Sequence, residues 1–174
     1  MKNTVHGALD GLYLACIWVA GLSILAMSII IPIGVFARYV LGFGAQWPEP
    51  IAILLMVIFT FVGAAAAYRA GAHIAVAMMT DRLPKPMQGL CRLAVNLLML
   101  VVSLFMLFYG GKLSVETMGQ TLAALPWLPI GLTYLPVPLG GLLTLLFVLE
   151  TIFFGPQHHR PVVTFDHQVE EAGA

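Results

Sequence analysis

The sequence predicts an all-α membrane protein with four transmembrane helices, and two observations lead to that prediction. First, 60% of the 174 residues are hydrophobic and only 9% are charged, whereas soluble domains average roughly 45–50% and about 25%. Second, four long uncharged stretches follow one another, and each can supply the about 20 residues that cross a bilayer. With 8 basic and 8 acidic residues, the chain has no excess positive charge for binding nucleic acid.

The uncharged stretches cover residues 11–37, 50–68, 93–111 and 117–149. The first is longer than the about 7–15 residues of a signal-peptide core, so we interpret it as a helix that stays in the membrane. Four prolines between residues 126 and 138 interrupt the last stretch, because each removes a backbone donor. The predicted spans therefore lie near 12–37, 49–68, 89–111 and 135–154. They form one transmembrane domain, 1–155, followed by a polar cytoplasmic tail, 156–174, that we expect to be disordered.

The distribution of Lys and Arg predicts the orientation. The N-terminus, the second connection and the C-terminal tail hold six of these residues, while the first and third connections hold only Arg38 and Lys112. Both termini are therefore expected in the cytoplasm. On that side, Arg69, Arg82, Lys85 and Arg92 are expected to contact lipid headgroups.

Two connections have patterns of their own. Between His73 and Leu83, apolar residues alternate with small ones, which suits either a short segment lying in the membrane interface or an ordinary loop. The stretch from Lys112 to Leu125 places apolar residues at helical spacing, which predicts an outer amphipathic helix or a continuation of the third span, ending before Pro126. Its polar face consists of Lys112, Glu116 and Gln120.

The predicted helix centres contain no Asp, Glu, Lys, Arg or His. Ionisable residues inside a membrane are costly and usually mark transport pathways, so ion coupling by this chain alone is disfavoured. All five histidines lie outside the predicted spans, which disfavours a haem-binding bundle. No nucleophile elbow, phosphate-binding glycine loop or zinc spacing is present. We therefore predict no enzymatic activity and no cofactor or metal.

The interfacial residues are more informative. Trp47 suits the aromatic belt at the membrane surface, and Glu49 suits the positive end of a helix dipole. A purely structural role explains these residues as well as a functional role does. Arg38 lies one short loop before Glu49, so we expect the two to pair. Trp127 is expected to be another interfacial anchor. The small-residue pairs Gly63/Ala67 and Gly140/Thr144 suit close helix contacts, either within the chain or with a partner.

Taken in order, these clusters resemble the small membrane subunit, DctQ-like, of the tripartite ATP-independent periplasmic (TRAP) transporters. The resemblance extends to about Phe154. It departs from the family pattern at Pro50, where a second acidic residue is frequent, and at Ala77, where an Asp commonly follows the His-Ile pair. The residues that carry it are Arg38, Tyr39, Trp47, Glu49, Gly63, Ala64, Arg69, Gly71, His73, Ile74, Gln120, Tyr134, Pro136, Pro138, Gly140 and Gly141.

This resemblance implies two protein partners in a bacterial or archaeal inner membrane. One is a large membrane subunit that contains the substrate and sodium sites of a symporter. The other is a periplasmic binding protein that delivers an organic acid. The present chain would then be a scaffold in contact with lipids, with an outer docking surface formed by residues 112–134 and the first loop, 38–49.

Two other classes remain open at this stage. A self-contained homodimeric exporter would need a coupling carboxylate, for which Glu49 and Glu150 are the candidates. A membrane enzyme would need a cluster of catalytic side chains, and the sequence shows none. An assembly factor is harder to separate from a scaffold, because the two roles leave similar sequences.

Overall fold

The structure, a computed structural model, describes residues 2–42, 44, 46–71 and 84–155, and within them four helical segments are long and apolar enough to cross a membrane. This confirms the predicted fold class. The first three are α1 (Lys2–Tyr39), α2 (Pro48–Arg69) and α4 (Lys85–Glu116). The fourth consists of α5 (Ile130–Tyr134) and α6 (Pro136–Phe154), which follow each other at Leu135.

The helices α1 and α4 extend well beyond the predicted spans. Asp10, which ended the first uncharged stretch, lies inside α1, and α4 runs from Lys85 to Glu116 instead of 89–111. A charged residue ends an apolar run but does not end a helix, because its backbone hydrogen bonds are unaffected. The interfacial segment proposed for residues 73–83 and the tail at 156–174 fall outside the described residues.

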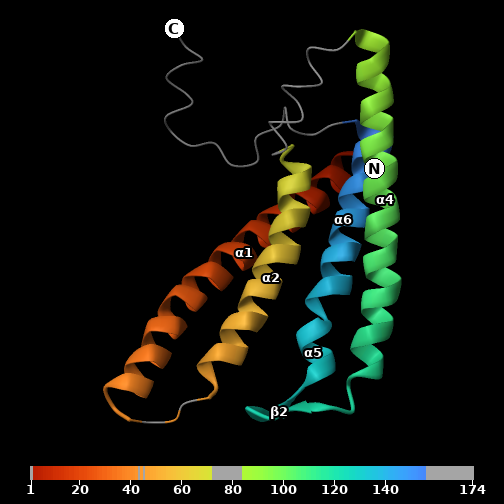
Figure 1. Ribbon diagram of the computed structural model, residues 1–174. Coiled ribbons are helices and arrows are strands. Elements are labelled where there is room, and N and C mark those ends of the chain that lie inside the picture. The colour runs from red at the N-terminus through yellow and green to blue at the C-terminus, as the bar shows by residue number, and fades with distance from the viewer. Residues whose placement is uncertain (1, 43, 45, 72–83, 156–174) are drawn as a thin grey trace, which may run out of the picture.

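The helices form a single row in the order α1, α2, α6, α4 (Figure 1). Two adjacent glycines allow α6 to lie between its neighbours. A Cβ atom at Gly140 would be 2.6 Å from Cβ of Phe61 on α2, and one at Gly141 would be 2.9 Å from Cβ of Met106 on α4. Gly140 thus makes a close helix contact within the chain, which was one of the two alternatives for the Gly140/Thr144 pair. Small residues of this kind let membrane helices approach closely.

The core of the row lies along α2 and α6, where Ala65, Phe147 and Val148 are fully buried. The outer helices α1 and α4 present large apolar side chains that nothing in the described chain covers. In a membrane, such surfaces face lipid or another membrane protein. These exposed side chains include Trp18, Leu22, Leu25 and Ile29 on α1 and Leu97, Val101, Phe105 and Phe108 on α4.

The row has two different ends (Figure 1). We call one the terminal end, because the beginning of α1 and the ends of α2 and α6 lie there. The opposite, hairpin end contains the α1–α2 connection and an antiparallel hairpin of β1 (Thr121–Leu122) and β2 (Leu125–Pro129).

The hairpin corrects the prediction of an amphipathic helix over residues 112–125. The helix does continue α4, but only to Glu116. Beyond it the chain reverses, and Leu125 and Leu128 become buried while Trp127 is 70% exposed. The Ser114 hydroxyl donates to the Gly131 carbonyl over 2.6 Å, which ties the far side of the hairpin back to α4. Burial of both leucines against the bundle outweighs the local helical pattern.

Candidate functional site

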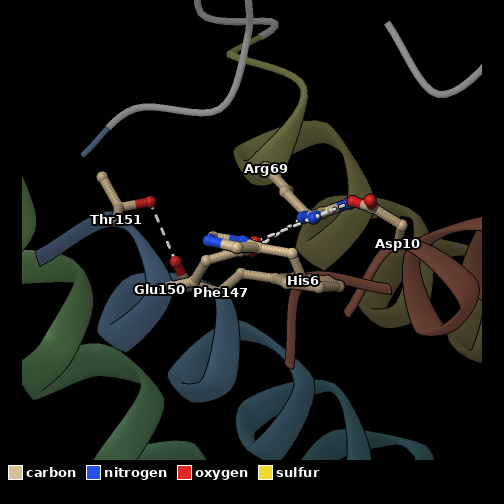
Figure 2. Close-up of polar contacts among 6 residues, drawn as sticks. All are labelled: His6, Asp10, Arg69, Phe147, Glu150 and Thr151. Carbon is tan, nitrogen blue, oxygen red and sulfur yellow. Dashed lines mark hydrogen bonds and ion pairs between the residues drawn. The ribbon is translucent and has the colours of Figure 1, made fainter. Parts of the chain in front are cut away.

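A buried cluster of charged side chains joins three helices at the terminal end (Figure 2). Its cation is Arg69, the last residue of α2, and its anions are Asp10 on α1 and Glu150 on α6. The Arg69 side chain is only 4% exposed and that of Glu150 is 0% exposed, whereas Asp10 retains 37%. We call these three residues the Arg69 cluster.

Arg69 binds Glu150 through two parallel hydrogen bonds. Nε donates to Oε2 over 2.7 Å and Nη2 donates to Oε1 over 2.8 Å, while Nη2 also donates to Oδ1 of Asp10 over 2.5 Å. The guanidinium carbon lies 5.1 Å from the ring centre of Tyr13 and 5.4 Å from that of Phe147. Bidentate pairing and aromatic faces both suit a planar guanidinium, so this site favours Arg over Lys.

His6 lies beside the cluster and is not fully paired. Its ring packs edge-on against Phe154, with centroids 4.7 Å apart. Its Nδ1 is 3.8 Å from Oε1 of Glu150, which is too long for a hydrogen bond, and this buried atom has no hydrogen-bond partner among the described residues.

This arrangement corrects the expectation that Arg69 contacts lipid headgroups. Because the side chain is buried and its charge is matched by two carboxylates, it does not reach the surface of the described chain. The signal that could have revealed the pairing is topological. With both termini on one side, the start of the first helix and the ends of the second and fourth meet at one membrane face, and these three places carry Asp10, Arg69 and Glu150.

At the hairpin end the expected pairing of Arg38 with Glu49 is confirmed, with 3.9 Å between Nη2 and Oε2. Their side chains are 51% and 72% exposed. Arg38 lies in the last turn of α1 and Glu49 in the first turn of α2, so each charge also complements the dipole of its own helix.

The remaining predicted interface residues are distributed over the hairpin end. Lys112 and Glu116 form an exposed pair one turn apart on α4, with 3.7 Å between Nζ and Oε1. Trp47, Gln120, Trp127 and Tyr134 are all exposed.

The structure brings only some of these residues together. Arg38, Glu49 and Tyr134 line one cleft of about 680 Å³, whereas Lys112 and Glu116 lie away from it. Of the other candidates, Lys85 begins α4, and His73 and Arg82 fall outside the described residues.

The arrangement of charges is better suited to holding helix ends together than to binding a metal ion or reacting with a ligand. The carboxylates of the Arg69 cluster are occupied by the guanidinium, and in the described parts of the chain no group of three or more His, Cys, Asp or Glu side chains is placed to hold a metal ion. The cluster instead fixes the terminal ends of α1, α2 and α6 to one another.

Comparisons with known proteins agree with the resemblance drawn from the sequence. The family model for the DctQ component of tripartite ATP-independent periplasmic transporters matches residues 27–155. The chain is 26% identical over 158 residues to a protein of Haemophilus influenzae provisionally named a TRAP transporter small permease protein, covering 88% of this chain and 95% of that one. It is also 29% identical over 144 residues to the ectoine TRAP transporter small permease protein TeaB of Halomonas elongata, covering 82% and 71%.

Proposed function

Because the chain belongs to the DctQ family of TRAP transporters, as a small membrane subunit, we propose that it scaffolds a large membrane subunit which binds substrate and sodium. In this role it widens the stationary part of the transporter, anchors it in the bilayer, and helps a periplasmic binding protein to dock. The substrate class we propose is an organic acid. One relative is named for ectoine, so ectoine is the first compound to compare.

The observation that carries this proposal is the placement of charge. In the described spans, the charged side chains lie toward the helix ends, and the buried carboxylate of Glu150 is matched within the chain by Arg69. A subunit that coupled ion movement to transport would need an available carboxylate in the membrane. The coupling sites are therefore assigned to the large subunit, and the exposed apolar edges of α1 and α4 supply surfaces for contact with it.

The same geometry argues against an independent exporter. Its two candidate carboxylates were Glu49 and Glu150. Glu150 is held by a bidentate Arg69, so it would have to break two hydrogen bonds to bind a transported ion. Glu49 is exposed at the hairpin end and paired with Arg38.

We orient the terminal end toward the cytoplasm and the hairpin end toward the periplasm, following the excess of Lys and Arg in the connections of the terminal end. A periplasmic protein would then meet the hairpin, the α1–α2 connection and the exposed Lys112–Glu116 pair.

Reconstitution tests the scaffold role. The chain alone in liposomes should show no uptake, whereas the chain together with its large subunit and binding protein should accumulate substrate in response to a sodium gradient. The two membrane subunits should also co-purify. Uptake by the chain alone, lost on Glu150→Gln, would overturn the proposal in favour of the exporter.

Charge reversal tests the docking surface. Lys112→Glu should weaken binding-protein association several-fold, while the double variant Lys112→Glu/Glu116→Lys restores the local ion pair and separates loss of the pair from loss of the surface charge. Arg92→Glu is the control because Arg92 is exposed near the other end of α4. Equal association for Lys112→Glu and Arg92→Glu would show that the binding protein docks elsewhere.

A further inference from the structure

Two apolar clefts flank α2 at the hairpin end and share one charged rim. The first, about 430 Å³, lies between α1 and α2, and the second, about 680 Å³, lies between α2, the hairpin and α5. Both are lined by Arg38, Glu49 and Ile53. The two apolar clefts therefore meet at one cation, Arg38, and one anion, Glu49.

Each cleft is about as long as one membrane leaflet is thick. At about 1.5 Å per residue, the first runs about 16 Å along α1 from Arg38 to Met27, and the second runs about 18 Å along α2 from Glu49 to Phe61. Half of a hydrocarbon core of about 30 Å is about 15 Å. When the two clefts lie at the level of the lipid acyl chains, the charged rim therefore lies at the level of the lipid headgroups.

The rim has charge to offer a ligand. Arg38 and Glu49 are separated by 3.9 Å and both are more than half exposed, so their mutual attraction is weak. An ion that bound between them would gain a charge-assisted contact with each residue. The rim thus matches a headgroup with one negative and one positive group.

We propose that this pair of clefts is a specific site for phosphatidylethanolamine in the leaflet on the hairpin side, with the phosphate at Arg38, the ammonium at Glu49 and one acyl chain in each cleft. An ethanolamine ammonium can donate hydrogen bonds to the Glu49 carboxylate, whereas the trimethylated group of phosphatidylcholine cannot. Phosphatidylglycerol satisfies Arg38 alone. The site thus discriminates between headgroups through Glu49 and recognises the two-chain lipid body through the clefts.

The test uses the full chain in nanodiscs that contain equal amounts of phosphatidylethanolamine, phosphatidylcholine and phosphatidylglycerol, followed by native mass spectrometry of the lipids retained. We expect one phosphatidylethanolamine per chain, preferred about fivefold over phosphatidylcholine, which corresponds to about 1 kcal/mol. Glu49→Gln should abolish this preference, and Arg38→Gln should lower retention of all three lipids. Equal retention of the three lipids by the unmodified chain would overturn the headgroup assignment.

A matched pair of tryptophan variants tests the clefts. Ile53 lines both clefts and is 51% exposed, whereas Ile33 on α1 is 50% exposed, lies at a similar depth and lines neither. Ile53→Trp should lose the lipid while Ile33→Trp retains it, with equal melting temperatures as the folding check. Equal retention by the two variants would overturn the site, as would crosslinking of Ile53→Cys to the large subunit with no lipid retained in the assembled transporter.

Discussion

Arg69 is the residue through which the terminal ends of α1, α2 and α6 are connected. Its guanidinium is nearly inaccessible and contacts two carboxylates and two aromatic rings. Forming such a buried pair gives little net stability, because desolvation of both charges offsets their attraction, but leaving one partner unpaired is costly. The cluster therefore specifies which helix ends meet more than it strengthens the fold.

The cost of breaking the cluster should depend on which member is removed. Arg69→Gln removes the cation shared by Asp10 and the buried Glu150, so both carboxylates lose their partner. It should lower the free energy of unfolding by about 3–5 kcal/mol. Glu150→Gln leaves Arg69 with Asp10 and should cost less. Asp10→Asn should cost least because Asp10 is partly exposed to solvent. Unfolding in mixed micelles, followed by circular dichroism, measures the order.

Arg38→Gln is the matched control, because it removes an arginine from an exposed pair and should change stability by no more than about 1 kcal/mol. If Arg69→Gln were as mild as Arg38→Gln, the charges of the Arg69 cluster would not be desolvated in the membrane.

The sequence could predict the exposed charges but not the buried cluster. Arg38 and Glu49 are close in sequence, so a short loop was enough to predict their pairing. Arg69 is 59 residues from Asp10 and 81 from Glu150, and a cation at a helix end fits lipid headgroups as well as a carboxylate. Only the arrangement of the helices decides between the two environments.

Among the helices, α6 has the tightest surroundings because its two neighbours touch it on adjacent residues. Gly140 lies against α2 and Gly141 against α4. Without a strong hydrophobic force between helices in lipid, close packing of this kind is a main source of association. These glycines therefore determine how near α2 and α4 can come to each other.

A methyl group at Gly140 should separate α2 from α6. Its Cβ would meet Phe61 at 2.6 Å, so Gly140→Ala should destabilise the chain by about 1–3 kcal/mol, as overpacking does. Gly111→Ala is the control because a Cβ there has no neighbour within 4 Å on other parts of the chain, and it should be neutral or slightly stabilising. The SDS concentration at half-unfolding compares the two, and equal midpoints would contradict the proposed packing.

The hairpin depends on a similar contact. A Cβ at Gly131 would lie much too close to the Ser114 carbonyl and to Met118, whereas a Cβ at Gly119 meets nothing within 4 Å. Gly131→Ala should therefore displace the hairpin from α4 and speed proteolysis near Trp127 several-fold, while Gly119→Ala should not. Unchanged proteolysis in Gly131→Ala would mean that the hairpin is not held at this position.

Element by element, the long spans were predictable and the hairpin was not. Apolar runs of about 20 residues have few structural alternatives. Residues 112–125 have helical spacing, yet the chain turns after Glu116 because Leu125 and Leu128 can be buried only by folding back. Periodicity describes one segment at a time, and this burial depends on the ends of the neighbouring helices.

At the scale of the whole molecule, the row of helices leaves α1 and α4 with uncovered apolar sides. Sequence predicted the number of spans but not their order in the row, because all four are similarly apolar. The order depends on small residues such as Gly140 and on the cluster around Arg69, whose contacts appear only in three dimensions.

A membrane-soluble carbene reagent should therefore label Trp18 and Leu25 on α1 and Leu97 and Phe105 on α4 in the isolated chain, while the fully buried Val148 stays unlabelled. On assembly with the large subunit, one of these two edges should become protected. Peptide mass spectrometry provides the measurement. Undiminished labelling of both edges in the purified complex would place the subunit contact outside the membrane spans.

The positions of the three charges along the chain also bear on how the protein is made. Asp10 and Arg69 belong to the first two helices, so they can meet as soon as that pair has entered the bilayer, whereas Glu150 is synthesised 81 residues after Arg69. Asp10 is thus the only anion of the cluster available to Arg69 while translation continues. We expect the first two helices to wait in the membrane as a charge-matched pair, and the last helix to complete the cluster when it leaves the translocon.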